Sequence, residues 1–194
     1  GFSNYLHSMN NDNTWLVAIG QNATSEGFST GLMVTVFNAS DPTNPQATAT
    51  YGFIDHNNGD NDFGGWSESD IRWDYKAFRY LQRAGKLIMP VDIWYHGEDP
   101  AEHDEFHGFA VLDVTKTSIT EQYRISHARE PGRCDYCHGE PFPTRSFVYR
   151  GDLMTVRDIT AVSTDLATGE EVWRMNVTVD GEPDYCGCGY FFFR

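Results

Sequence analysis

The feature that most constrains this chain is a strand, turn, strand pattern that occurs three times. The copies run from Gly31 to Phe53, from Gly108 to His127 and from Ile159 to Val177. In the first copy, Asp-Pro and Asn-Pro pairs mark the turn, because proline cannot donate to a β-ladder and favours tight turns. Each copy follows another pair of β-rich segments. The repeating unit therefore has about four strands, which is the size of one β-propeller blade.

The composition agrees with an all-β repeat protein. The 194 residues include 14% aromatic residues, 18 Gly and 8 Pro, a profile that suits short strands joined by tight turns. We expect one domain over residues 1–194, with blades at about 3–53, 71–127 and 144–179 and a Cys- and Phe-rich tail at 180–194. The blades are farther apart than the roughly 40 to 50 residues of a bare blade, because three polar insertions separate their strands.

The predicted strands can be placed by alternation and turn residues. The first blade has strands at Asn4–Met9, Trp15–Gln21, Leu32–Asn38 and Gln46–Phe53; the second at Lys76–Leu81, Lys86–Tyr95, Phe109–Val114 and Thr120–Ser126; the third at Ser146–Arg150, Leu153–Arg157, Thr160–Ser163 and Glu171–Val179. The insertions are Asp55–Ser69, His96–His107 and Ala128–Thr144. Loops of this length often carry function, so we expect any chemistry to lie there.

Three blades are too few for a closed ring, since propellers typically have about four to eight. Two large apolar sides would remain uncovered. We therefore expect this chain to be part of a larger propeller, completed by remaining blades or by neighbouring subunits in an oligomer or fibre. The aromatic tail Tyr190–Phe193 is either buried against such a neighbour or forms a closing strand of its own blade.

Charge and sequence motifs narrow the class of protein. A net charge of −14 disfavours nucleic acid and anionic membrane surfaces as partners, and no apolar run is long enough to insert into a bilayer. Asn22, Asn38 and Asn176 each begin an N-glycosylation acceptor triplet. Strand alternation predicts that Asn176 points to solvent, opposite Trp173 and Met175. With paired cysteines, these triplets favour an extracellular glycoprotein, secreted or held at the cell surface.

Several motifs resemble one known family. They are Ser3–His7, Ile19–Gln21, Gly31–Leu32 leading through Phe37 to Ser40–Pro45, Asp74–Phe78 and Arg124–His127. The chain resembles the secreted bacterial and archaeal proteins with a C-terminal β-propeller domain distantly related to WD40-type repeats. It departs from them at Tyr75, where such proteins tend to have His. The resemblance implies an extracytoplasmic propeller with no established catalytic residues, so no active site can be transferred to this chain.

Four cysteines form two close pairs, Cys134 with Cys137 and Cys186 with Cys188. In an oxidising compartment they would form two disulfide bonds, and all three connectivities remain open. Four thiolates could instead hold a tetrahedral zinc ion. A third interpretation includes His138, which completes the pentapeptide used to attach a c-type haem.

Two further segments contain metal-ligating residue types. Asp55, Asn57, Asp60 and Asp62 offer hard oxygen ligands for calcium, although Trp66 occupies the position where an EF-hand has its bidentate acid; the alternative is a solvated turn. His96, His103 and His107 lie among acidic residues and suggest a transition-metal site, the alternative being an acidic surface loop. For His7 and His127, in or beside predicted strands, we expect structural roles.

The sequence therefore favours a non-enzymatic extracellular β-propeller module for binding or structural assembly. No Gly-x-Ser-x-Gly elbow or activated cysteine context indicates hydrolysis by a nucleophile. The first alternative is a c-type haem electron-transfer protein that uses Cys134, Cys137 and His138. The second is a metal-dependent hydrolase built on the histidine-rich loop.

Overall fold

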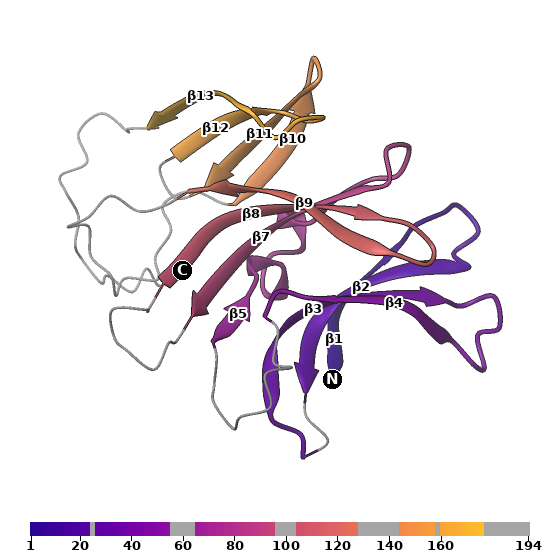
Figure 1. Ribbon diagram of the computed structural model, residues 1–194. Coiled ribbons are helices and arrows are strands. Elements are labelled where there is room, and N and C mark those ends of the chain that lie inside the picture. The colour runs from indigo at the N-terminus through magenta and orange to yellow at the C-terminus, as the bar shows by residue number, and fades with distance from the viewer. Residues whose placement is uncertain (24–25, 55–64, 96–103, 128–143, 158–159, 177–194) are drawn as a thin grey trace, which may run out of the picture.

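Three antiparallel sheets follow one another along the chain and are arranged like a fan (Figure 1). The computed structural model describes residues 1–23, 26–54, 65–95, 104–127, 144–157 and 160–176. Within these ranges there are 13 strands and two single-turn 3-10 helices. Neither helix has the length needed to span a bilayer. The predicted all-β propeller architecture, with one sheet for each blade, is confirmed.

In the first and third sheets each strand pairs with the next in sequence, and in the second sheet the first two strands both pair with the third. The first sheet contains β1 (Phe2–Ser8), β2 (Trp15–Ala23), β3 (Ser29–Asn38) and β4 (Gln46–Gly52). The second contains β5 (Trp66–Glu68), β7 (Lys86–Tyr95), β8 (Asp104–Val114) and β9 (Ile119–Ser126), with β6 (Arg79–Leu81) also paired to β7. The third contains β10 (Arg145–Tyr149), β11 (Asp152–Arg157), β12 (Thr160–Asp165) and β13 (Glu171–Asn176).

The second sheet differs from its prediction at three places. Strand β5 lies inside the segment expected to be an insertion and pairs with the far half of β7. Residues 75–77 form a 3-10 turn, η2 (Tyr75–Ala77), rather than the start of a strand, because the Asp74 carboxylate caps it by accepting a hydrogen bond from the Lys76 N–H at 3.0 Å. Strand β8 begins at Asp104, so the last part of the predicted histidine-rich loop, including His107, is in the sheet.

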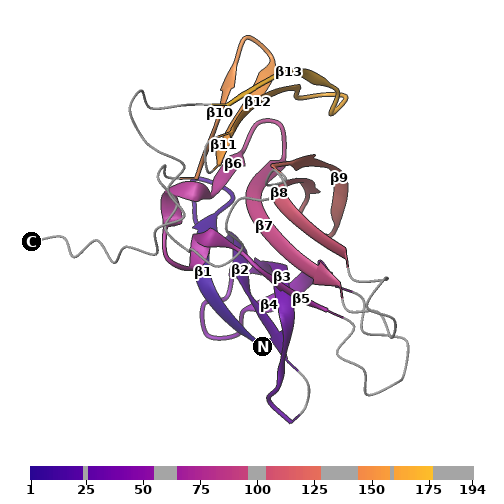
Figure 2. The ribbon, with the colours of Figure 1, turned by 90° about the vertical axis from the view of Figure 1, so that its left-hand side faces the viewer.

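Both faces of the second sheet are buried, one against each neighbouring sheet (Figure 2). Alternate side chains of a strand point to opposite faces, so the continuous apolar run of β7 serves both. Leu87 and Met89 pack with Val17, Ile19 and other residues of the first sheet. The intervening Ile88 packs with Phe109 and Val111 of β8 and with Leu153 and Val162 of the third sheet.

The outermost strand β13 is exposed at every position. Asn176 is exposed, but so are Trp173 at 39% and Met175 at 53%. Among the described residues, no sheet packs on the face of β13 that the alternation assigned to the interior.

Candidate functional site

Most of the site residues predicted from the sequence lie outside the described residues. This group comprises the four cysteines and His138, the calcium candidates Asp55, Asn57, Asp60 and Asp62, and the histidines His96 and His103. The disulfide, zinc, haem and calcium assignments therefore stay predictions. Among the residues that the structure does describe, no three His, Cys, Asp or Glu side chains group as metal ligands.

The three asparagines of the acceptor triplets differ in exposure. Asn22 and Asn176 are exposed. Asn38 is half-buried, and its side-chain oxygen accepts a hydrogen bond from the Ser40 N–H at 3.0 Å. Occupancy by glycans stays a prediction for all three.

The described histidines have packing or ion-pair roles. His7 lies 4.8 Å from the Phe78 ring, centroid to centroid, and burial lowers its pKa. His127 is buried, and its Nε2 lies 2.9 Å from Thr155 Oγ1. These contacts are the structural roles predicted for the two side chains. His107, a candidate metal ligand, instead places its Nδ1 2.5 Å from Asp92 Oδ1.

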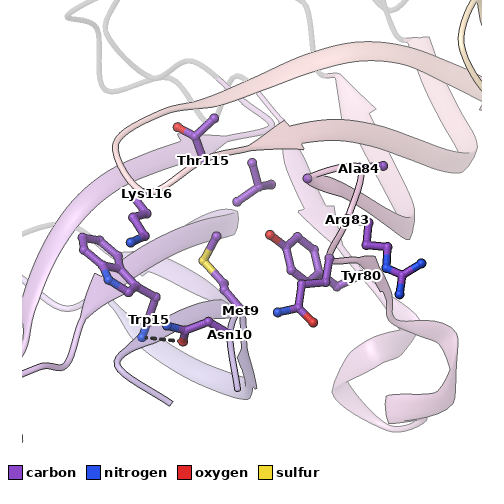
Figure 3. A pocket seen from close by; sticks show the side chains of 11 residues that line it. Met9, Asn10, Trp15, Tyr80, Arg83, Ala84, Thr115 and Lys116 are labelled. Atoms are coloured by element: carbon purple, nitrogen blue, oxygen red, sulfur yellow. Dashed lines mark hydrogen bonds between the residues drawn. The ribbon is translucent and has the colours of Figure 1, made fainter. Parts of the chain in front are cut away.

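A cavity of about 420 Å³ lies between the first and second sheets, at the end where the short turns gather (Figure 3). We call it the inter-blade pocket, and its size falls within the range of small-molecule sites. Three turns contribute its lining: β1 to β2, β6 to β7, and β8 to β9. The lining residues are Met9, Asn10, Trp15, Tyr80, Gln82, Arg83, Ala84, Gly85, Val114, Thr115 and Lys116.

Hydrogen bonds join the second turn to the third and the third turn to β4, and another closes the first turn. The Val114 N–H donates to the Gly85 carbonyl at 2.7 Å, which joins the second and third turns. The Thr48 hydroxyl donates to the Lys116 carbonyl at 2.6 Å, which joins the third turn to β4 of the first sheet. In the first turn, the Trp15 N–H donates to Asn10 Oδ1 at 3.1 Å. Hydrogen bonds that each involve a backbone group therefore restrain the turns that line the pocket.

A buried ion cluster lies between the second and third sheets. Arg157, at the end of β11, is 1% exposed, and its guanidinium reaches into the second sheet. It donates to Asp92 Oδ2 at 2.6 Å and to Asp70 Oδ1 of η1 (Asp70–Arg72) at 3.1 Å. It also donates to the carbonyl oxygens of Val91 at 3.3 Å and Gly108 at 3.0 Å. A buried arginine requires such partners, because an unpaired charge in the interior is very unfavourable.

The charges around Asp92 set its ionisation. Burial alone would raise the pKa of Asp92, but the hydrogen bond from His107 and the positive charges of Arg157 and His107 together outweigh it. The net pKa lies below the usual range. Asp74 behaves similarly, since its ion pair with Arg145 at 2.5 Å and the Lys76 N–H offset its burial and lower its pKa. Asp92 and Asp74 thus stay ionised on the side of the second sheet that meets the third.

The sequence reasoning found neither of these sites. It directed attention to the long insertions, whereas the pocket is lined by short turns and the ion cluster by strand residues. The predicted strands leave short turns between Met9 and Trp15 and between Leu81 and Lys86, and a propeller places the turns of successive blades at one end. That rule could have pointed to the pocket. The pairing of Arg157 with Asp92 has no local signal, because 65 positions separate the two residues.

Comparison with known families identifies the fold. A family model described as a β-propeller domain matches residues 1–169. The chain belongs to this β-propeller family. No curated protein matches it significantly.

In this β-propeller, each sheet is one blade. The inter-blade pocket lies between the first and second blades, and the ion cluster lies between the second and third. Clefts between packed units are common positions for ligand sites, so the pocket is the better candidate for binding. The ion cluster, with Arg157 enclosed and shared by two carboxylates, holds two blades together.

Proposed function

We propose that this β-propeller is a non-enzymatic extracellular module for binding and structural assembly, in which further propeller blades cover its two end faces. The extracellular location rests on the acceptor triplets, the paired cysteines and the resemblance of the sequence to secreted proteins. The assembly role rests on one structural observation, the exposed apolar residues on the outer faces of the first and third blades.

The outer face of the first blade carries large apolar side chains. Register places Leu6 opposite Ala18, and Leu16 opposite Phe37, on the face that points away from the second blade. Leu6 is 56% exposed, and Leu16, Met33 and Phe37 are half-buried. A single exposed leucine is unremarkable, but a group on one sheet face indicates an interaction surface.

The outer face of the third blade has the same character. Phe147 lies opposite Met154, and Ser163 lies opposite Trp173. Phe147 is 44% exposed, and Met154 and Val156 are half-buried. The two inner interfaces show that blades of this chain stack through alternate apolar side chains. By continuity with those interfaces, the partner we propose for each end face is another four-stranded blade.

Self-association of the purified 194-residue chain tests the assembly role. We expect concentration-dependent association in sedimentation velocity, because uncovered apolar faces attract one another. Met175→Glu, on the outer face of the third blade, should weaken it. Thr120→Glu, on an exposed position of β9, adds the same charge elsewhere and should leave it unchanged. A folded chain that stays monomeric at all concentrations would refute the proposal.

An intact mass under reducing and non-reducing conditions tests the extracellular features. Two disulfides lower the non-reduced mass by four hydrogens, occupied acceptor triplets add glycan mass, and a covalent haem adds its own mass and a Soret band. Unmodified thiols and bare asparagines in protein recovered from its native host would count against an exported module. A haem would instead support the electron-transfer alternative.

A further inference from the structure

We propose that the inter-blade pocket binds a small organic anion that has a flat apolar body and one carboxylate group. This goes beyond the assembly role and concerns a different interface, so either proposal can fail without the other. Four properties of the pocket support it: its charge, its unused donors, its apolar floor and its fixed shape.

The charge of the pocket is opposite to that of the chain. The chain has 28 acidic and 14 basic residues, yet no carboxylate lines the pocket, where Lys116 is the cation that faces the cavity and Arg83 lies at the rim. The carboxylate that faces Lys116 from the neighbouring turn is Asp12, which already accepts hydrogen bonds from the hydroxyl and N–H of Thr14 at 2.7 and 3.1 Å. An anion is therefore attracted to the pocket, whereas most of the molecular surface repels it.

Two donors at the pocket have no hydrogen-bond or ion-pair partner within the described part of the chain. The Lys116 ammonium lies 4.9 Å from the centroid of the Trp15 ring, a cation–π contact that leaves its protons available. The Tyr80 hydroxyl points toward Met9 across the pocket (Figure 3). Burial raises the pKa of Tyr80, so this hydroxyl stays protonated and can donate. One ammonium and one phenol together suit a carboxylate, whose two oxygens can each accept a hydrogen bond.

The rest of the lining suits a flat apolar group. Met9 and Val114 are 7% and 3% exposed and form the floor, while the rings of Trp15 and Tyr80 stand at either side. Arg83 points away from the cavity in Figure 3, so a single cation faces a bound molecule. This favours a ligand with one negative charge over a phosphate with two. Because hydrogen bonds restrain each of the turns that line the pocket, little ordering is needed on binding.

The probe for this site is phenylacetate, compared with the neutral 2-phenylethanol and with acetate, which lacks the ring. Saturation-transfer NMR on the full 194-residue chain observes the ligand, so self-association of the protein does not obscure it. We expect phenylacetate to bind with a dissociation constant on the order of 1 mM. We expect 2-phenylethanol and acetate each to bind at least about fivefold more weakly, since each lacks one of the two recognised groups.

Three variants locate the binding. Lys116→Gln should weaken phenylacetate binding about fivefold or more, and Tyr80→Phe about twofold to fivefold, through loss of the two donors. Arg83→Gln also removes one positive charge from the rim of the pocket. Because the Arg83 guanidinium points away from the cavity, we expect the dissociation constant for phenylacetate to change less than twofold at physiological salt. All three positions are partly or fully exposed, and a urea melt of each variant verifies the fold.

Three results would overturn the proposal. The first is no saturation transfer to phenylacetate at concentrations on the order of 10 mM. The second is equal affinity for phenylacetate and 2-phenylethanol, which would make the pocket merely apolar. The third is an equal loss of affinity in Lys116→Gln and Arg83→Gln, which would show that the charge of the whole molecule, rather than the pocket, attracts the anion.

Discussion

The two interfaces between blades are built from different chemistry. The first joins the first and second blades through a cluster of 17 buried apolar residues. Within the residues that the structure describes, the second joins the second and third blades through a cluster of six buried apolar residues, beside the cluster of Arg157, Asp92 and Asp70. An apolar interface is stabilised by the area that it buries, whatever the exact pairing. The ion cluster tolerates only one alignment, because the acceptors of Arg157 lie on η1, β7 and β8. Blades of the same repeat are therefore packed together at the first interface by buried apolar area, and at the second interface also by directional ion pairs.

Removal of the buried Arg157 guanidinium should cause the largest loss in the free energy of unfolding. Arg157→Ala leaves Asp92 and Asp70 without their shared partner, and breaking a buried ion pair costs about 3 to 5 kcal/mol. We expect the loss to be concentrated in the third blade, whose smaller apolar cluster cannot compensate. Hydrogen exchange measured by mass spectrometry on peptides from β10 to β13 would report it.

Arg174→Ala is the matched control for this variant. Arg174 also lies in the third blade, donates to the Ser126 carbonyl of the second blade at 2.9 Å and pairs with Glu171 at 2.7 Å, but its side chain is 36% exposed. An exposed pair contributes at most about 1 kcal/mol. If Arg157→Ala and Arg174→Ala lowered protection by the same amount, the buried cluster would have no special part in the second interface.

A cavity in the first interface should give the next largest effect. Leu112 is fully buried in the apolar cluster that joins the first two blades. Leu112→Ala should cost about 2 to 5 kcal/mol, as large-to-small changes in a core do. Urea unfolding would measure the total, and exchange in β2 and β3 would show that the first interface carries it. Exchange that increased only in the third blade would contradict the division into two separate interfaces.

Acid should act on the second interface before the first. The pKa of Asp92 is lowered in the folded protein, so its ion pairs stabilise the fold above the unfolded pKa of about 3.9 and lose that effect as the pH falls through the folded value. We therefore expect protection of β11 and β12 to decrease below about pH 4, while the buried amides of β2 and β3 stay protected. Asp92→Asn should flatten this pH dependence. Equal loss of protection at the two interfaces as the pH falls would refute the prediction that acid acts first on the second interface.

Tyr51 and Tyr123 each donate a hydrogen bond from one blade to the next, one at each interface. Loss of either hydrogen bond should give the smallest change in the free energy of unfolding. The Tyr51 hydroxyl donates to Glu121 Oε2 at 2.7 Å across the first interface, and the Tyr123 hydroxyl donates to the Leu166 carbonyl at 2.9 Å across the second. Tyr51→Phe and Tyr123→Phe should each cost about 0.5 to 1.5 kcal/mol in urea unfolding. A much larger loss for one of them would identify a contact on which that interface depends.

Alkaline titration is a second test of the same two tyrosines. Burial and the hydrogen bond to Glu121 raise the pKa of Tyr51 to about 12, and burial with the charges of Asp165 and Asp113 raises that of Tyr123 to about 12. Both pKa values exceed that of tyrosine in the unfolded chain. The two neutral hydroxyl groups therefore stabilise the fold below about pH 10, and this stabilisation is lost as the pH rises toward 12. Spectrophotometric titration should lose a component near pH 12 in each Phe variant.

Glycine at the last turn shows how a tertiary contact can select a residue. Gly169 has a φ of +80°, which favours glycine, and a Cβ at this position would lie 2.6 Å from the ring of Tyr123 in the neighbouring blade. The sequence placed a turn here, between the predicted strands at Thr160–Ser163 and Glu171–Val179. It could not show that the glycine also makes room for the second interface.

The strand predictions succeeded where the pattern is local and failed where the signal depends on distant residues. Strands β2, β4 and β7 begin at the predicted residues, because alternation and turn residues define them. Strand β5 was missed, since three residues are too few to show a period and only pairing with β7 stabilises them. The start of β6 was placed too early because Asp74 caps a 3-10 turn that the apolar pattern does not reveal.

The sequence by itself determined the all-β repeat and its division into sheets of about four strands, because strand periodicity and turn chemistry act between neighbouring residues. The tertiary structure alone decided which residues meet between blades. Arg157 reaches Asp92 and Asp70, and Lys116 meets Trp15 and Tyr80, only after separate sheets have stacked. Such contacts depend on the geometry of stacking, and local residue patterns do not encode it.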